Sequence, residues 1–173
     1  MGSGGRNVFL IQPEDEPNMK QMIESVMRDG YVIAQEYFPA ASQGDIRLFM
    51  VNGKPFRVGN KVAALKRVGS GKDVRNNIHA GGHAEAVEIT DEILELTEIV
   101  RPKLVKDGIF FAGLDIVEDK LLEVNVFSPG GLGIASKLLH KDFVAEMIEL
   151  LEHKVAYKRY CTAHLDNVEM NTL

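Results

Sequence analysis

The sequence predicts an α+β domain in which an antiparallel sheet is flanked by helices. Two hairpin signals predict the sheet: "NGK" at residues 52–54 follows an alternating strand, and residues 113–126 contain two apolar strands joined by a tight turn. Two helical patterns begin at the capping residues Thr90 and Asp142, and they predict the flanking helices. With 173 residues, the chain is long enough for one domain with a substantial core.

The N-terminal part of the chain predicts two short strands around one helix. "NVFLI" (7–11) and "YVIAQEY" (31–37) have strand patterns, which Pro13 and Pro39 end. Between them, apolar residues recur at helical spacing, and Gly30 supplies a stop. These apolar residues are Met19, Met22, Ile23 and Val26.

The middle of the chain predicts a hairpin followed by a long polar segment. "DIRLFMV" (45–51) is the first strand of the hairpin, and the return strand covers about 56–67. Residues 69–83 then contain four glycines and no apolar period. A segment of this kind inside a compact domain is either disordered or a functional lid.

The C-terminal part predicts two amphipathic helices, separated by the second hairpin and a loop, "FSPGGLG" (127–133). The first helix ends before Gly108, and its inward stripe is Ile93, Leu96, Val100 and Leu104. The inward residues of the last helix are Phe143, Met147 and Leu151. From Tyr160 onward the sequence is polar, which predicts a frayed tail.

The composition excludes several classes of protein. A net charge of −5 argues against nonspecific nucleic-acid binding, which depends on an excess of lysine and arginine. The single Cys161 excludes an intrachain disulfide framework and a multi-cysteine zinc site, and it fits a reduced, cytoplasmic setting. No apolar run reaches the roughly 18 residues of a membrane span, and no signal-peptide core is present, so no membrane partner is expected.

The second hairpin places polar residues where its pattern is otherwise apolar. Because side chains alternate across a strand, Glu123 and Asn125 share one face. Matching the apolar faces of both strands puts Asp115 opposite Glu123 and requires a three-residue loop at 118–120. The apolar pairs in this register are Leu114–Val124 and Ile116–Leu122.

Two interpretations of this face stay open at this point. Facing carboxylates repel each other, and a cation between them removes that penalty. Two carboxylates and an amide oxygen are hard ligands, which suit Mg²⁺ when phosphate oxygens complete the shell. The alternative is a solvated acidic face on an ordinary hairpin.

Arginines elsewhere in the chain could supply the cationic half of a phosphate site. Arg47 and Arg67 lie on the strands of the first hairpin, and Arg75 lies in the glycine-rich segment. Guanidinium groups bind phosphate in bidentate fashion and stay charged at working pH. Each arginine alone is typical of a solvated surface charge. Only the combination of the arginines with the carboxylate pair indicates a phosphate site.

Several runs together carry a resemblance to a known family. They are "GDIRLFMVNGKP", "LKRV", "RNNIHAGG" and "PKL…DGIFFAGLDIVEDKLLEVNVFSP". Over about residues 2–151 the chain resembles the C-terminal portion of bacterial glutathione synthetase, an ATP-grasp ligase. The resemblance implies the α+β fold of an ATP-grasp C-terminal lobe, with an antiparallel sheet and flanking helices, plus a remnant of the adjacent lobe.

The resemblance also implies an activity, cofactors and partners. ATP phosphorylates the carboxylate of γ-glutamylcysteine, glycine attacks the acyl-phosphate, and ADP and phosphate leave. The implied cofactors are ATP and Mg²⁺, with Mn²⁺ as a second candidate metal. The partners are these small molecules, and a homo-oligomer stays open.

The resemblance assigns roles to individual residues. The implied metal ligands are Asp115, Glu123 and Asn125. The implied nucleotide-binding residues are Gly4 and Gly5 in a glycine-rich loop, Gln35, Glu36, Tyr37 and Phe38 in an adenine hinge, and Asp45. The implied catalytic residues are Arg47 and Arg67 around the phosphates, and Arg75 and Asn77 in the lid. The implied substrate contacts are Arg75, Asn77, Ser128 and Pro129. Without the resemblance, residues 35–39 are equally consistent with a strand end, and residues 128–129 with a turn.

These assignments divide the chain into three parts. Residues 1–38 are expected to be a remnant of the ATP-grasp N-terminal lobe, 39–159 the C-terminal lobe with a lid at 69–83, and 160–173 a polar tail. "MGSGG" fits either a cloning remnant or the end of a glycine-rich loop. Because the family draws on both lobes for its phosphate clamp, the isolated chain is expected to be incomplete and inactive.

Two other functions remain as alternatives. Ribosomal-protein glutamate ligases share the ATP-grasp fold and a lid pattern that "NNIHAGG" fits. The spacing of three between Asn125 and Ser128, however, favours the glutathione synthetase pattern. A non-catalytic nucleotide-binding module is the alternative from a different class.

Overall fold

The computed structural model describes residues 8–28, 30–69, 82–161 and 164–173. Its centre is a six-stranded sheet in the order β6-β5-β1-β7-β8, with β2 paired to β1, and every pair is antiparallel. The sheet strands are β1 (Asp45–Val51), β2 (Lys54–Pro55), β5 (Ala64–Val68), β6 (His83–Glu85), β7 (Phe111–Val117) and β8 (Lys120–Asn125). A small separate hairpin is formed by β3 (Arg57–Val58) and β4 (Lys61–Val62).

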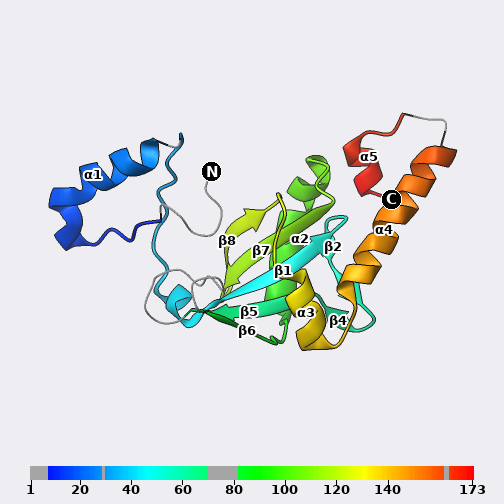
Figure 1. Cartoon of the computed structure of the whole chain (residues 1–173), viewed down its shortest axis with the longest axis horizontal. Coiled ribbons are helices and arrows are strands. Elements are labelled where there is room, and N and C mark those ends of the chain that lie inside the picture. The colour runs from blue at the N-terminus through cyan, green and yellow to red at the C-terminus, as the bar shows by residue number, and fades with distance from the viewer. Residues whose placement is uncertain (1–7, 29, 70–81, 162–163) are drawn as a thin grey trace.

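Helices cover both faces of the sheet, and α1 lies apart from it (Figure 1). The helices are α1 (Glu16–Met27), α2 (Asp91–Lys106), α3 (Leu132–Leu139), α4 (Phe143–Tyr160) and α5 (Asn167–Asn171), with short 3₁₀ turns at Pro13–Asp15 and Pro39–Gln43. This arrangement confirms the predicted α+β class with an antiparallel sheet.

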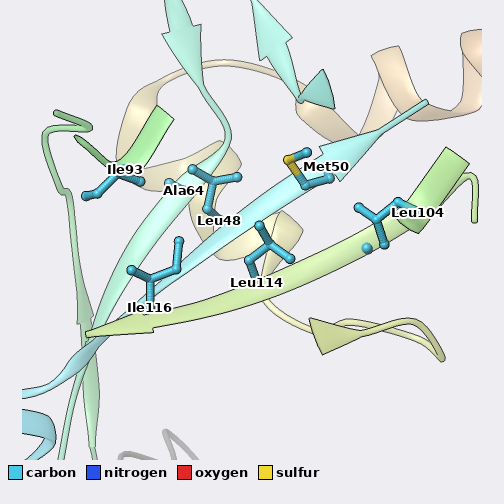
Figure 2. Close-up of a cluster of buried hydrophobic side chains, with 8 residues drawn as sticks. Leu48, Met50, Ala64, Ile93, Leu104, Leu114 and Ile116 are labelled. Atoms are coloured by element: carbon cyan, nitrogen blue, oxygen red, sulfur yellow. The ribbon is translucent and has the colours of Figure 1, made fainter. Parts of the chain in front are cut away.

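Strand alternation divides the core into two clusters, one on each face of the sheet. On the first face, side chains of β1, β5 and β7 pack under α2, and Figure 2 shows Leu48, Leu114 and Ile116 of this cluster together with Ile93 and Leu104 of α2. On the second face, α3 and α4 cover the other cluster. Its buried members are Phe49, Val51, Phe56, Ala63, Leu65, Ala135, Phe143 and Met147.

The first predicted hairpin turn is confirmed. Val51 pairs with Lys54, so Asn52 and Gly53 form a two-residue turn with φ angles of 52° and 69°. Positive φ at both positions is what this turn requires, and asparagine followed by glycine meets it at low cost. A Cβ at Gly53 would lie 2.6 Å from Val105 Cγ2, so this turn also packs closely on α2.

Three strand predictions differ from the structure. The segments 8–11 and 31–37 form no strand, and the return strand at 56–67 is divided into β3, β4 and β5. A strand needs a hydrogen-bonded neighbour, and no described strand pairs with either N-terminal segment. In the return strand, Gly59 at φ 61° reverses the chain into the β3–β4 hairpin before β5 rejoins the sheet.

The predicted helical stripe of α2 is confirmed, whereas that of α4 is partly wrong. Ile93 and Leu104 of α2 are buried, with Leu96 and Val100 packed against the same cluster. In α4, Phe143 and Met147 are buried, but Leu151 is 39% exposed. Leu150 packs on the core instead, because a spacing of four and then three residues follows the helical period more closely. Asp142 caps α4 by accepting a hydrogen bond from the Ala145 amide at 2.9 Å.

Two helices in the structure were not predicted. The loop predicted at 127–133 ends earlier, because α3 begins at Leu132. The polar stretch after Tyr160 contains α5, which Asp166 and Glu169 cap reciprocally. Lys154 of α4 donates to the Met170 carbonyl and lies 5.2 Å from the centre of the Phe110 ring. Burial lowers the pKa of Lys154. Within the described residues, no helix is both long and apolar enough to cross a bilayer.

Candidate functional site

Four charged side chains interact across three neighbouring strands of the sheet. In the register, Asp45 of β1 is the direct partner of Arg67 of β5, and Arg47 of β1 is the direct partner of Asp115 of β7. Alternation puts Arg47 on the same face of β1 as the core residue Phe49, which packs in the second cluster. Asp45, Arg47 and Asp115 are each about 95% buried, with exposed fractions of 5%, 6% and 4%. We call these four residues the ionic cluster.

Hydrogen bonds join the ionic cluster into one network. Arg47 binds both carboxylate oxygens of Asp115, through Nε to Oδ1 and through Nη2 to Oδ2 at 2.8 Å. Arg67 Nη2 contacts Oδ2 of Asp45 and also lies 2.8 Å from Asp115 Oδ2. Arg67 therefore bridges the two aspartates, and buried charge on this face is compensated by paired groups.

The second hairpin adds Glu123 and Asn125 next to the ionic cluster. Asp115 is the direct partner of Glu123, and Leu114 is the partner of Val124, as the alternating pattern predicts. Asn125 Nδ2 donates to Asp115 Oδ2 at 3.3 Å, and the amide oxygen is the atom of this side chain that could bind a cation. The three predicted metal ligands thus lie together at one position on β7 and β8.

The loop of this hairpin differs from the prediction. Val117 pairs with Lys120, so the turn has two residues, and Glu118 has a φ of 53°. Ile116 pairs with Leu121 rather than Leu122, because a β-bulge shifts the register between Asp115 and Ile116. The bulge makes Leu122 the extra residue of β8, and it restores the facing of Asp115 and Glu123 that a two-residue turn alone would lose.

Electrostatics at the site shift the pKa values of three groups. Burial and repulsion from Asp115 raise the pKa of Glu123, although Arg47 and Arg67 oppose the rise. Burial raises the pKa of Asp45, and this effect outweighs the hydrogen bond from Arg67. Burial lowers the pKa of Arg67, but attraction to Asp115 and Asp45 is stronger, so its pKa is raised overall.

The predicted adenine hinge, residues 35–38, contacts β8 through one side chain. Gln35 Nε2 donates to the Leu122 carbonyl at 3.3 Å, which is the carbonyl of the bulged residue. Glu36 and Tyr37 lie on the same exposed segment, and Phe38 is half-buried. Gln35 therefore lies against β8, the strand that carries Glu123.

The loop predicted to contact substrate also reaches the ionic cluster. Arg47 Nη1 donates to the Gly130 carbonyl at 3.1 Å. Pro129 is buried, and Ser128 is exposed with a φ of 55°. One arginine thus holds both the β7 carboxylate and the loop that leads into α3.

Four predicted site residues lie outside the described residues: Gly4, Gly5, Arg75 and Asn77. Sequence reasoning missed two positions beside the cluster, the Gly130 carbonyl and Gly113 of β7, which lies against Arg47. The contact of the Gly130 carbonyl cannot be predicted from the sequence, because every residue has a backbone carbonyl. Gly113 could be predicted, because a glycine within an apolar strand marks a close approach of another group.

The candidate site at Asp115 and Glu123 does not coincide with a groove or with a cluster of three acidic side chains among the described residues. A groove of about 620 Å³ lies elsewhere, between α2 and the β2–β3 region, and its lining includes Lys54, Arg57 and Arg101. Among the described residues, no three His, Cys, Asp or Glu side chains are arranged to hold a metal ion. A cation at Asp115 and Glu123 would therefore need Asn125 and ligand oxygens to complete its shell.

The chain has clear relatives among known protein families and proteins. The family model for the prokaryotic glutathione synthetase ATP-grasp domain matches residues 1–139. The glutathione synthetase of Synechococcus elongatus is 38% identical over 133 residues, which are 76% of this chain and 39% of that protein.

Two further relatives extend the match. The glutathione synthetase of Agrobacterium fabrum is 34% identical over 155 residues, covering 88% of this chain and 46% of the relative. That of Vibrio parahaemolyticus is 31% identical over 156 residues, covering 89% and 48%. The chain spans less than half the length of each of these relatives. The family match covers most of the chain, and the chain belongs to the prokaryotic glutathione synthetase ATP-grasp family.

Proposed function

We propose that this chain carries the metal- and phosphate-binding face of a glutathione-synthetase-type ligase. The whole protein would join γ-glutamylcysteine and glycine in an ATP-dependent reaction that passes through an acyl-phosphate and releases ADP and phosphate. The observation that supports this most is the facing pair Asp115 and Glu123 beside two arginines on one sheet face.

The donor set fits Mg²⁺, with Mn²⁺ as the alternative. Asp115, Glu123 and Asn125 offer carboxylate and amide oxygens, the ligands that hard divalent cations prefer. When bound, the cation supplies positive charge at the oxygens of the transferring phosphoryl group. Burial raises the pKa of Glu123, and repulsion from Asp115 adds to this rise; the charge of the cation would relieve that repulsion.

The two arginines of the ionic cluster are assigned different tasks. The side chain of Arg67 is 19% exposed and bridges Asp45 and Asp115, so it lies at the open edge of the cluster. We assign Arg67 to the phosphate groups of the nucleotide. Arg47 has an 8% exposed side chain that is engaged by Asp115 and by Gly130, which suits holding the site together.

The remaining assignments follow the family. The segment 35–38 would bind the adenine, and the contact of Gln35 with β8, the strand that carries Glu123, supports this assignment. Asp45 would lie near the nucleotide, and Ser128 and Pro129 near the peptide substrate. Gly4, Gly5, Arg75 and Asn77 keep their predicted roles in phosphate and lid contacts. The single Cys161 supports a reducing, cytoplasmic setting.

The choice of substrates rests on the relatives. The three described above are named glutathione synthetases, which favours γ-glutamylcysteine and glycine over a ribosomal-protein substrate. A non-catalytic nucleotide-binding module would share the same face, so only an assay of turnover separates it from a ligase.

The test has a binding arm and a turnover arm. Isothermal titration of this chain with Mg-ATP should give heat that Glu123→Gln abolishes and Glu118→Gln preserves, because Glu118 is an exposed residue of the same hairpin turn. ADP release by the full-length protein should require both γ-glutamylcysteine and glycine. Binding without turnover in the full-length protein would support the module, and equal heat in both variants would contradict the metal site.

A further inference from the structure

Arg47 connects two parts of the site that the sequence places far apart. Its guanidinium donates to both oxygens of Asp115 on β7 and, through Nη1, to the Gly130 carbonyl at 3.1 Å. Residues 47 and 130 are 83 positions apart in sequence, and the side chain of Arg47 is 8% exposed. Buried, charge-assisted hydrogen bonds of this kind fix the geometry of the groups they join.

The path of the Arg47 side chain depends on a missing side chain. A Cβ built on Gly113 would lie 2.9 Å from Arg47 Cδ and 2.9 Å from Pro129 Cβ. Both distances are shorter than real Cβ contacts, so the arginine or the loop would have to move. Gly113 is not among the positive-φ glycines, and backbone conformation therefore does not explain why a glycine stands there.

We propose that Gly113 is a positioning residue of the ligase site. Because Gly113 has no Cβ, it leaves a slot beside β7 that the Arg47 side chain and Pro129 occupy, and the Arg47 guanidinium can then bind both Asp115 and the Gly130 carbonyl. The inference rests on the proposed function, because it treats Asp115 as a metal ligand and residues 128–129 as substrate contacts. If Gly113 has this role, it fixes the position of the metal ligand Asp115 relative to the substrate loop at residues 128–130.

The first experiment compares Gly113→Ala with the matched control Gly133→Ala. A Cβ at Gly133 in α3 would meet nothing within 4 Å, so the control makes the same chemical change in open space. Two quantities are measured on this chain: the hydrogen-exchange rate of the Arg47 Nε–H by NMR, with its signal assigned from Arg47→Lys, and the affinity for Mn²⁺ by electron paramagnetic resonance.

The expected result is a selective loss in Gly113→Ala. Its Arg47 Nε–H should exchange at least about tenfold faster, and its Mn²⁺ affinity should fall about 10- to 100-fold, the range seen when partners that orient metal ligands are removed. Gly133→Ala should match the wild type in both measurements. A Gly113→Ala variant that keeps wild-type exchange at Arg47 would overturn the proposal.

Rescue separates positioning from a general effect on the strand. Pro129→Gly removes one of the two atoms that the new methyl group would meet, so Gly113→Ala/Pro129→Gly should regain part of the protection at Arg47. If Gly113→Ala does not fold, recovery of folding in the double variant supports the slot, and a double variant that also fails to fold contradicts it. If the wild type binds no Mn²⁺, the proposed function fails, whereas the exchange at Arg47 still decides the role of Gly113.

Discussion

The β1–β7–β8 region and the N-terminal segment at 8–37 show similar apolar patterns in sequence but differ in what covers them. Leu48, Leu114 and Ile116 of the sheet are 0% exposed. On α1, by contrast, Met19, Ile23 and Met27 are 39%, 36% and 57% exposed, and Figure 1 shows this helix away from the sheet.

The difference teaches what an apolar stripe can establish. A stripe identifies the face of a helix or strand that is suited to burial, but it contains no information on whether a partner lies against it. In the sheet the partners are α2, α3 and α4. For α1 the described residues supply few contacts, so its contribution to stability here should be small.

The largest expected effect comes from breaking the ionic cluster. Arg47→Ala should lower the free energy of unfolding by about 3–5 kcal/mol, because it leaves Asp115 buried without its bidentate partner. Urea denaturation of this chain measures the change. Lys20→Ala on α1 is the control, since its ion pair with Glu24 is exposed and should contribute little. An Arg47 variant as stable as the control would show that the cluster is loosely held.

A core truncation tests the same comparison without charge. Leu114→Ala should lower the free energy of unfolding by about 2–5 kcal/mol, the range for deleting a fully buried leucine side chain. Ile23→Ala on α1 should cost less than about 1 kcal/mol, since Ile23 is 36% exposed. Matching losses from the two truncations in urea denaturation would mean that α1 packs as firmly as the sheet.

Much of the covered region was predictable, because its signals are local. The turn at Asn52 and Gly53, the stripe of α2 and the facing of Asp115 and Glu123 all depend on residues close in sequence. The bulge at Leu122 was not predictable, since a three-residue loop and a two-residue turn with a bulge satisfy the same alternation.

Contacts between strands that are distant in sequence could not be predicted either. Arg47 and Asp115 each suggested a role from the sequence, but their pairing depends on β1 lying next to β7, which no local pattern specifies. The strand predicted at 31–37 was wrong for a related reason: its apolar residues suit a strand, but no strand of the described residues pairs with it.

The pH dependence of stability should show that the charged form of Glu123 is unfavourable in the ligand-free fold. A carboxyl group with a raised folded-state pKa binds its proton more tightly when folded, so its contribution to stability falls as pH rises from its ordinary value of 4.5 through the raised value. Glu123→Gln should therefore gain stability relative to the wild type across that window and keep the gain above it.

The check is a series of urea denaturations below and above pH 4.5, with Glu118→Gln as the control in the same hairpin. The difference between Glu123→Gln and the wild type should vanish at the acid end. A loss of stability in Glu123→Gln at neutral pH would mean that Glu123 stabilises the ligand-free fold, contrary to the repulsion from Asp115.

The smallest expected effect lies where the two regions meet. Gln35 Nε2 bonds the Leu122 carbonyl at 3.3 Å in an exposed position, so Gln35→Ala should change the free energy of unfolding by no more than about 1 kcal/mol. Its local effect should be larger, because this bond ties the segment 31–38 to β8 and the segment has no strand partner among the described residues. Limited proteolysis should therefore cut Gln35→Ala faster within 31–38, while hydrogen exchange in β1 and β7 stays unchanged. Glu36→Ala, one position along the same exposed segment, is the matched control. Equal cleavage of the two variants would show that the segment is held by something other than the bulge in β8.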